Sequence, residues 1–307
     1  MVTLPPQVQV IVRDWLSANH VLLQDRDEIV LIDTGYASRS TLTLALLKSA
    51  LRDRPITSIV NTHCHSDHMG GNAAIAREYG CDIAIPEGEV PLIEAWDERA
   101  LLLGYCDQAA GRFTPDRALR DGEINRWGGL EWLATATPGH DMGAMCFYNA
   151  KHRVLLSGDA LWANGFGFVM PPAIDPVALP ATRATLQALA KLPIDIVIPG
   201  HGEPFGDVGS AFERAFRRLE SFEADPSRLP RYAVKAVFAF TLLDRGSFLV
   251  DELPAYIEHI DMYREFNERF FGLSPTAFAG WIIEELGRAG AIRREGSRIV
   301  PSVATAG

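Results

Sequence analysis

The chain has 307 residues, of which 48% are hydrophobic and 22% are charged, a composition typical of a folded globular protein rather than a disordered one. Its formal net charge of −10 argues against a dedicated nucleic-acid-binding protein, which normally presents a basic face, although it leaves room for a local basic patch. The four cysteines include no Cys-x-x-Cys pair, so a disulfide framework is not expected.

The N-terminal segment shows neither the basic stretch nor the apolar core of a signal peptide. No apolar run approaches the length of a membrane span. We therefore expect a cytoplasmic protein that does not cross a membrane. The length suffices for one large domain and one small one.

The first part of the chain predicts a sheet covered by a helix. Short apolar stretches separated by polar turns predict three strands at residues 7–13, 20–24 and 28–32. Asp33 ends the third strand, where it is either a turn former or a group that orients a metal-binding histidine. His20 is interpreted as a turn residue rather than a ligand. Apolar spacing at residues 39–51 predicts a helix lying on the sheet.

The densest cluster of chemically active side chains follows the next predicted strand. A β-branched apolar run at residues 56–60 predicts a buried strand. It leads into the run His-Cys-His-Ser-Asp-His at residues 63–68, and two glycines then precede a predicted helix at residues 72–79. The cluster therefore lies where a strand ends and the chain turns into a helix.

The spacing inside this run is typical of a metal site. His63 and His65 are two residues apart in extended chain, so they point to the same side and can bind one ion. Asp67 and His68 lie in the turn and can bind a second ion beside the first. The same alternation turns Cys64 away from the metal. Imidazole and carboxylate ligands suit zinc, iron or manganese better than calcium or magnesium.

The middle of the chain carries fewer reactive groups. Residues 82–85 predict a strand and residues 89–103 a helix. Residues 105–120 are irregular and are interpreted either as a lid or binding loop or as a plain surface loop.

Three more metal-type side chains follow predicted strands at glycine-containing turns. His140 follows residues 131–137, and Asp159 follows a hairpin whose strands are residues 146–148 and 154–156. His201 follows an apolar strand at residues 194–198. Each is weak evidence alone, because an aspartate after a glycine also makes ordinary turns. Their recurrence at strand ends predicts one shared site at the edge of a sheet sandwich.

An aromatic loop at residues 162–172 separates Asp159 from a predicted helix at residues 179–192. We expect Trp162, Phe166 and Phe168 to overhang the site and contact substrate; the alternative is a loop that packs on the core. A further helix is predicted at residues 207–223.

The C-terminal part predicts a separate small module. Residues 225–230 are interpreted as a linker, and helices are predicted at residues 231–243, 250–267 and 274–288, followed by a hairpin within residues 290–300. This order suggests a winged-helix-like module. Its 9 basic and 10 acidic residues leave only a modest basic patch, formed by Arg288, Arg293, Arg294 and Arg298. We favour a packing, dimerising or lid role over nucleic-acid reading, so a homodimer is one expected form.

The His-x-His-x-Asp-His run resembles the signature of the metallo-β-lactamase superfamily, in its glyoxalase II and lactamase-like branch, and the resemblance covers about residues 8–225. It implies an α/β fold, a four-layer αββα sandwich, with residues 1–225 as catalytic domain and residues 231–307 as the small, mainly helical winged-helix-like domain. Pro138-Gly139-His140 matches the family turn, whereas the following Asp141-Met142-Gly143 departs from its most familiar form.

By this resemblance the ligands fall into two metal sites. Site one is His63, His65 and His140, and site two is Asp67, His68 and His201. Asp159 bridges the two metals. Asp67 is also the candidate to orient the nucleophile and accept its proton. The cofactors are expected to be two divalent ions, zinc first, with iron or manganese as alternatives.

The predicted function is hydrolysis of a small acyl substrate (a thioester, lactone or related amide) by a metal-bridging hydroxide. The alternatives are a phosphodiesterase or ribonuclease of the same fold, a mononuclear-iron persulfide dioxygenase, and a non-catalytic metal-dependent binding module. β-Lactam resistance is the least favoured hydrolytic function, because such enzymes are exported.

Overall fold

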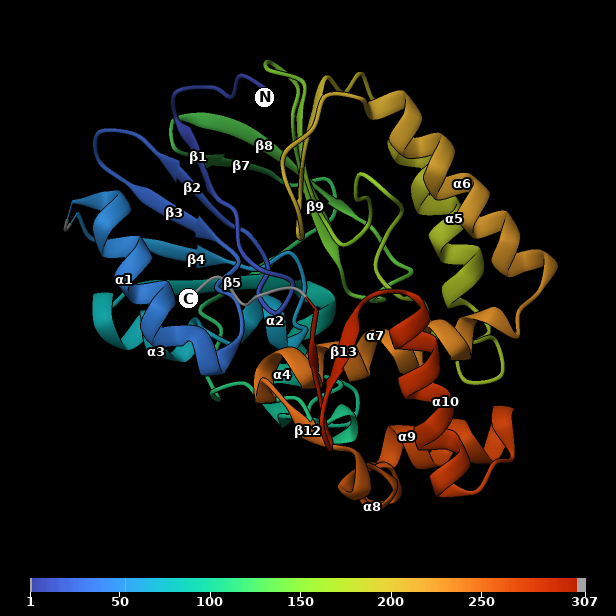
Figure 1. Cartoon of the computed structure of the whole chain (residues 1–307). Helices are drawn as coiled ribbons and strands as arrows, with labels where there is room; N and C mark the ends of the chain where they lie inside the picture. Colours follow the sequence, from blue (N-terminus) through green and yellow to red (C-terminus); the bar gives the residue numbers. More distant parts are fainter. Residues whose placement is uncertain (1, 53, 303–307) are drawn as a thin grey trace.

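The computed structural model describes residues 2–52 and 54–302, and two facing sheets form its centre (Figure 1). The first sheet has the order β1-β2-β3-β4-β5-β6. Its strands are β1 (Val8–Ile11), β2 (His20–Gln24), β3 (Ile29–Ile32), β4 (Ser58–Val60), β5 (Asp82–Pro86) and β6 (Arg117–Leu119). β1 to β3 pair antiparallel, and β3 to β6 pair parallel, so the carboxyl ends of β3, β4 and β5 meet at one edge.

The second sheet has the order β11-β10-β9-β8-β7. Its strands are β7 (Ile124–Trp127), β8 (Leu130–Ala136), β9 (Met145–Asn149), β10 (Val154–Gly158) and β11 (Ile196–Pro199). β10 and β11 are parallel, whereas the other pairs are antiparallel. The inner faces of the two sheets share one buried apolar cluster that includes Leu23, Ile32, Trp132, Phe147 and Leu156.

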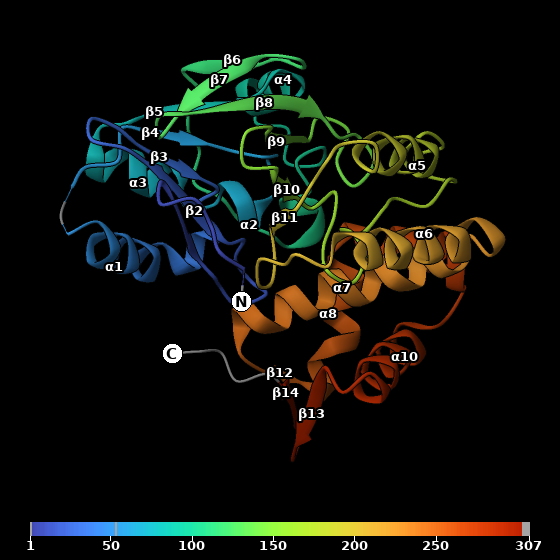
Figure 2. The same cartoon turned by 90° about the horizontal axis from the view of Figure 1, so that it is seen from above.

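Helices cover the outer face of each sheet. α1 (Ser40–Leu51), α3 (Asn72–Tyr79) and α4 (Val90–Ala95) lie on the side of the first sheet, and α5 (Ala178–Leu189) and α6 (Val208–Ala224) cover the second (Figures 1 and 2). Leu47 of α1 and Ile75 of α3 are fully buried against the first sheet, and Leu186 and Leu219 are buried against the second. The predicted αββα sandwich is therefore confirmed.

The C-terminal part adds helices and a small sheet below the sandwich (Figure 1). It comprises α7 (Arg228–Arg245), β12 (Phe248–Leu249), α8 (Leu253–His259), α9 (Asp261–Phe266), α10 (Pro275–Arg288), β13 (Ile292–Glu295) and β14 (Arg298–Pro301), with strand order β12-β14-β13. Ser274 caps α10 by accepting the Ala277 amide, as its Ser-Pro start suggests. The core of this part also contains Tyr105 and Cys106.

Several predicted boundaries were wrong, and single backbone conformations explain two of them. The helix expected at residues 89–103 ends at Ala95, because Trp96 takes a left-handed conformation. The helix expected at residues 250–267 is divided, because Ile260 is extended between α8 and α9. The second half of the expected linker is helix, since α7 begins at Arg228. Strands β6 and β7 were not predicted.

The described residues include no helix that combines the length and apolar character needed to cross a bilayer. The division into domains at residues 225 and 231 stays a prediction.

Candidate metal centre

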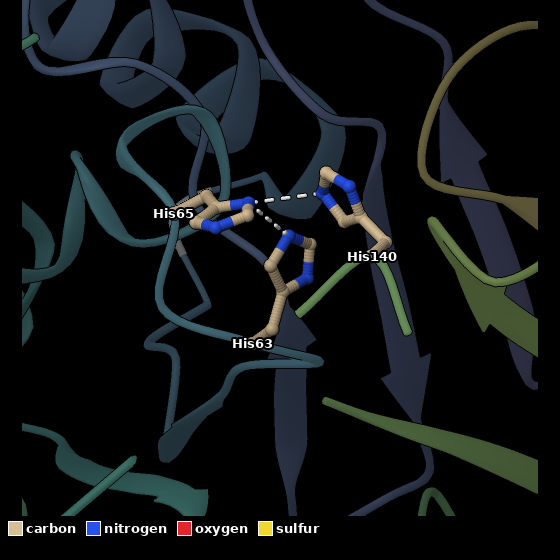
Figure 3. A group of neighbouring side chains, drawn as sticks. All are labelled: His63, His65 and His140. Atoms are coloured by element: carbon tan, nitrogen blue, oxygen red, sulfur yellow. Dashed lines mark hydrogen bonds between the residues drawn. The ribbon is translucent and has the colours of Figure 1, made fainter. Parts of the chain in front are cut away.

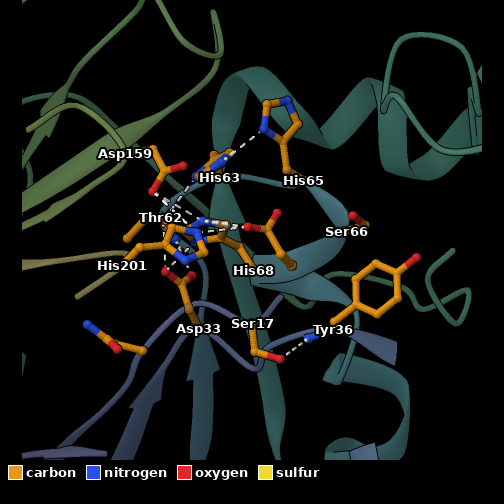
Figure 4. A network of polar contacts seen from close by, with 12 residues as sticks. Ser17, Asp33, Tyr36, Thr62, His63, His65, Ser66, His68, Asp159 and His201 are labelled. Atoms are coloured by element: carbon orange, nitrogen blue, oxygen red, sulfur yellow. Dashed lines mark hydrogen bonds and ion pairs between the residues drawn. The ribbon is translucent and has the colours of Figure 1, made fainter. Parts of the chain in front are cut away.

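The structure brings all seven predicted ligands to one edge of the sandwich, where several strands end. Figure 4 labels His63, His65, His68, Asp159 and His201 among them. They come from five segments: the turn after β4, the short helix α2 (Ser66–Met69), and the turns after β8, β10 and β11. The members of this seven-residue cluster are His63, His65, Asp67, His68, His140, Asp159 and His201. Six of them are buried, and His140 is partly buried.

Three histidines form the first group (Figure 3). His65 Nδ1 lies 3.1 Å from His63 Nε2 and 2.9 Å from His140 Nε2. Nitrogen atoms in a tetrahedral zinc site, with Zn–N bonds of about 2.0–2.1 Å, lie roughly 3.3 Å apart. The three imidazoles are thus arranged closely enough to share one ion.

Asp67, His68 and His201 form the second group, and Asp159 lies between the two. Asp67 Oδ2 is 2.9 Å from His201 Nε2 and 3.6 Å from His68 Nε2. Asp159 Oδ1 is 3.4 Å from His68 Nε2, while its Oδ2 is 3.4 Å from His140 Nε2. Each oxygen of the Asp159 carboxylate therefore faces a different group, as a bridging ligand would.

Groups outside the cluster fix the direction of its rings. His68 Nδ1 lies 2.8 Å from Asp33 Oδ2, and the other oxygen of Asp33 accepts the Thr62 amide at 2.9 Å. The Asp33 contact leaves His68 Nε2 to point into the cluster, so Asp33 acts as an orienting residue, one of its two predicted roles. His140 Nδ1 contacts the carbonyl oxygen of Phe168, which likewise leaves Nε2 of His140 facing the cluster.

The electrostatics of the cluster fit divalent cations. Burial lowers the pKa of His65 to about 4, with His140 adding to the effect, and burial lowers the pKa of His63 well below its usual value. Both are therefore neutral at pH 7, the form that binds metal. Burial alone would lower the pKa of His68, but Asp33, Asp67 and Asp159 raise it well above normal. Its buried Nε2 has no hydrogen-bond partner among the described residues, although two carboxylates lie nearby. A cation at this point would satisfy His68 Nε2 and the carboxylates of Asp67 and Asp159.

Aromatic side chains surround the cluster. Trp15 stacks on the His201 ring at 5.3 Å between centroids, and Phe168 stacks on His65 at 6.2 Å. Trp162 Nε1 donates to Asp159 Oδ1 at 3.1 Å. Phe166 differs from the prediction: it is buried in the core cluster behind the loop and packs on Phe222, so it does not face the site. The loop thus combines both interpretations, because Phe166 packs inward while Trp162 and Phe168 line the cavity described below.

A cavity of about 400 Å³ opens from the cluster toward the C-terminal part. Its walls include His65, Asp67, His140 and Asp159 of the cluster and several residues of α7. Most other lining side chains are apolar. Trp15 and the α7 residues could not be predicted to line the site, since no sequence motif links them to the predicted ligands.

His20, Cys64 and His152 lie outside the cluster, which was expected for the first two, although His20 lies in a strand rather than in a turn. His20 is buried in β2, where its Nε2 contacts Arg13 and lies 3.2 Å from Thr43 Oγ1. Cys64 is buried among apolar residues such as Met69. His152 is partly buried in the β9–β10 turn. Asp141, which departs from the family turn, places its Oδ2 3.4 Å from His65 Nε2 and so supports that ring.

Gly200 offers a test of the cluster that removes no ligand. A Cβ at this position would lie 2.3 Å from Asp159 Oδ1 and 2.9 Å from His68 Cε1, so Gly200→Ala should push these side chains aside while the fold persists. We expect metal affinity to fall about 10–100-fold, measured by competition with a chromophoric chelator. Gly209→Ala is the control, because its Cβ position faces open space. It should bind metal normally. Equal metal affinity in both variants would contradict the assigned geometry.

The comparisons with known proteins agree on one family. The model of the metallo-beta-lactamase superfamily matches residues 13–201. A hydroxyacylglutathione hydrolase from Rhizobium etli is 28% identical over 70% of this chain and 77% of its own length. An acyl-coenzyme A thioesterase from Bos taurus is 23% identical over 67% of this chain and 78% of its own. A structure solved in a di-iron-bound form has a TM-score of 0.53 and 28% identity, covering 65% of this chain and 94% of that one.

Proposed function

The chain belongs to the metallo-β-lactamase superfamily and is a metal-dependent hydrolase, and from this we propose that it cleaves a carboxylic-acid derivative at a centre of two divalent ions, zinc in the first place. The observation that carries the proposal is the Asp159 carboxylate, whose two oxygens face His140 and His68, each at 3.4 Å. A carboxylate shared between two ligand groups is the geometry of a two-ion site.

The seven-residue cluster would divide between the two ions. His63, His65 and His140 would hold one ion, and Asp67, His68 and His201 the other, with Asp159 between them. When bound, such ions supply a water that loses its proton near neutral pH, and they polarise the substrate carbonyl. The chain's own residues then position that water and the substrate.

Asp67 is the residue proposed to handle the proton. Its Oδ2 is held by His201 at 2.9 Å, and Asp67 lines the cavity through which substrate arrives. In the reaction, water adds to the acyl carbon, the bond from that carbon to sulfur, oxygen or nitrogen breaks, and Asp67 passes the proton from water to the leaving group. The products are a carboxylic acid and the thiol, alcohol or amine.

Trp162, Phe168 and Trp15 are proposed to shape the approach to the cluster. The hydrogen bond from Trp162 to Asp159 holds the bridging carboxylate in place. The rings of Phe168 and Trp15 lie against His65 and His201 and reduce the access of bulk water to these ligands.

The names of the relatives and the cavity both favour an acyl substrate. The two relatives are named hydroxyacylglutathione hydrolase and acyl-coenzyme A thioesterase, so each name describes release of an acyl group from its carrier. A phosphodiester is less favoured, because the described residues that line the cavity include no lysine or arginine to hold phosphates.

A substrate panel tests the proposal. Zinc-loaded protein is assayed with thioesters, lactones, a chromogenic β-lactam and bis-nitrophenyl phosphate, each before and after treatment with a chelator. We expect chelator-sensitive turnover of a thioester or lactone at least 10²-fold above that of the phosphodiester. Turnover of the phosphodiester alone would replace acyl hydrolysis with phosphodiester hydrolysis. One iron per chain in the protein as purified, together with no hydrolysis of any substrate in the panel, would favour the oxidative alternative.

A further inference from the structure

Helix α7 forms one wall of the cavity, although it belongs to the C-terminal part of the chain. Tyr232, Ala236, Ala239, Phe240 and Leu243 of α7 line the cavity, and their spacing places them on one face of the helix. The Phe240 ring lies 6.0 Å from the His201 ring, so α7 reaches the metal cluster itself. The site is therefore bounded by residues outside the part of the chain that the family model matches.

Polar contacts hold α7 in this position at its C-terminal end. Ser38 Oγ donates to Asp244 at 2.5 Å, and Arg39 donates to the Leu243 carbonyl at 3.3 Å. Arg245 pairs with Asp107 at 2.7 Å. These contacts join α7 to loops of the sandwich, so the wall is part of the folded structure.

The remaining walls are mostly apolar, with Asp14, Ser66 and Gln108 as polar members outside the metal cluster. Leu101 and Leu102 come from the loop before β6, and Ala291, Ile292 and Pro301 come from β13, β14 and the turn before them. The charged residues of the lining are the carboxylates Asp14, Asp67 and Asp159, apart from histidines of the cluster. Two of these carboxylates belong to the cluster. The part of the cavity beyond the metal cluster thus suits an uncharged, apolar group.

We propose that this cavity holds the apolar acyl chain of the substrate, and that α7 limits the length of chain that fits. The inference rests on the proposed acyl hydrolysis, and it assigns the acyl side of the substrate to the cavity and any charged carrier to the solvent. Ala236 and Ala239 provide the space, since both are small, half-buried and face the cavity between the larger Tyr232 and Phe240.

The first experiment varies the length of the acyl chain in two series of substrates. Acetyl, hexanoyl and decanoyl thioesters of N-acetylcysteamine are compared with γ-lactones of increasing alkyl length. We expect kcat/KM to rise about fourfold for each methylene buried, until the cavity is full. The series with the higher kcat/KM shows whether a thioester or a lactone is the preferred substrate class. A decanoyl substrate with a terminal carboxylate should lose this gain. Equal kcat/KM at all chain lengths would overturn the proposal.

The second experiment fills the cavity. Ala239→Trp should lower the ratio of decanoyl to acetyl kcat/KM at least tenfold, because the indole occupies space meant for the chain. Ala188→Trp is the matched control: it lies on the exposed face of α5 and should leave the ratio unchanged. If Ala239→Trp does not fold, as judged by circular dichroism, Ala236→Leu serves as the smaller change, with the same expectation. The same ratio in the cavity variant and the control would refute the assignment.

Binding separates this inference from the proposed function. Calorimetric titration of zinc-loaded protein with decanoate and acetate needs no turnover. We expect decanoate to bind at least 10²-fold more tightly than acetate, and the difference to shrink in the Ala239→Trp variant. If no ester, thioester or lactone is hydrolysed but decanoate binds in this way, the proposed function fails and the chain-binding cavity stands. Equal affinities would remove the cavity assignment even if hydrolysis occurs.

Discussion

Replacing Asp159 with asparagine is expected to lower kcat/KM about 10³-fold, which corresponds to ~4 kcal/mol of lost transition-state stabilisation. Asp159 is the group that faces both halves of the cluster, and its carboxylate is ionised because the neighbouring histidines hold its pKa well below its usual range despite burial. An amide of the same shape removes that charge, so one of two ions should be lost. Metal content by mass spectrometry and kcat/KM measure both effects.

Asp195→Asn is the matched control for this substitution. Asp195 lies just before β11, and its exposed carboxylate pairs with Arg153 at 3.0 Å. Exposed pairs contribute ~0–1 kcal/mol to stability, so this variant should keep its metal and activity within about twofold. The account of the bridging residue is contradicted if Asp159→Asn also keeps both.

The second large effect is expected for Asp67→Asn, which should reduce kcat by roughly 10²–10⁴-fold. The carboxylate of Asp67 combines contact with His201 and exposure to the cavity, so it can accept the proton of the attacking water. An asparagine retains an oxygen for metal but cannot take up a proton. We therefore expect kcat to fall much more than metal content, a difference that a purely structural role would not produce.

Asp14→Asn provides the comparison for Asp67. Asp14 lines the same cavity but is not part of the three ligand groups. Its substitution should change kcat less than about fivefold. If the Asp67 variant loses metal in proportion to activity, Asp67 acts only as a ligand. If kcat falls equally in the Asp67 and Asp14 variants, the effect comes from the charge of the cavity in general.

The local motif made most members of the seven-residue cluster predictable. His63, His65, Asp67 and His68 are close in sequence, so their spacing alone indicated a metal site. His140, Asp159 and His201 could be added because each follows a strand at a glycine-containing turn, and the structure places these turns at one edge. Because the same local pattern recurs at several strand ends, these residues could be assigned to one site without knowledge of their contacts in the fold.

Other features depended on contacts that no local pattern encodes. Strand β7 was missed because its alternation is inverted: Ile124 and Arg126 are exposed, whereas Asn125 and Trp127 are buried. Phe166 and Phe168 share one loop, and only the fold decides that the first enters the core and the second faces His65.

The cavity wall formed by α7 was beyond sequence reasoning for the same reason. Its residues lie more than 150 positions from the His-x-His-x-Asp-His run, and their apolar spacing is that of any amphipathic helix. Only the packing of α7 against the sandwich brings one face of this helix next to the metal cluster. The packing, dimerising or lid role expected for the C-terminal part stays a prediction, although α7 supplies one wall of the cavity.

The most direct test of the two-ion site is the metal stoichiometry of the active protein. Protein stripped with a chelator is titrated with zinc while thioester or lactone hydrolysis and bound metal are both recorded. Two divalent ions per chain, with activity rising until the second equivalent is bound, is the result that the shared Asp159 predicts. Full hydrolytic activity with a single ion, or no activity with two ions bound, would contradict it.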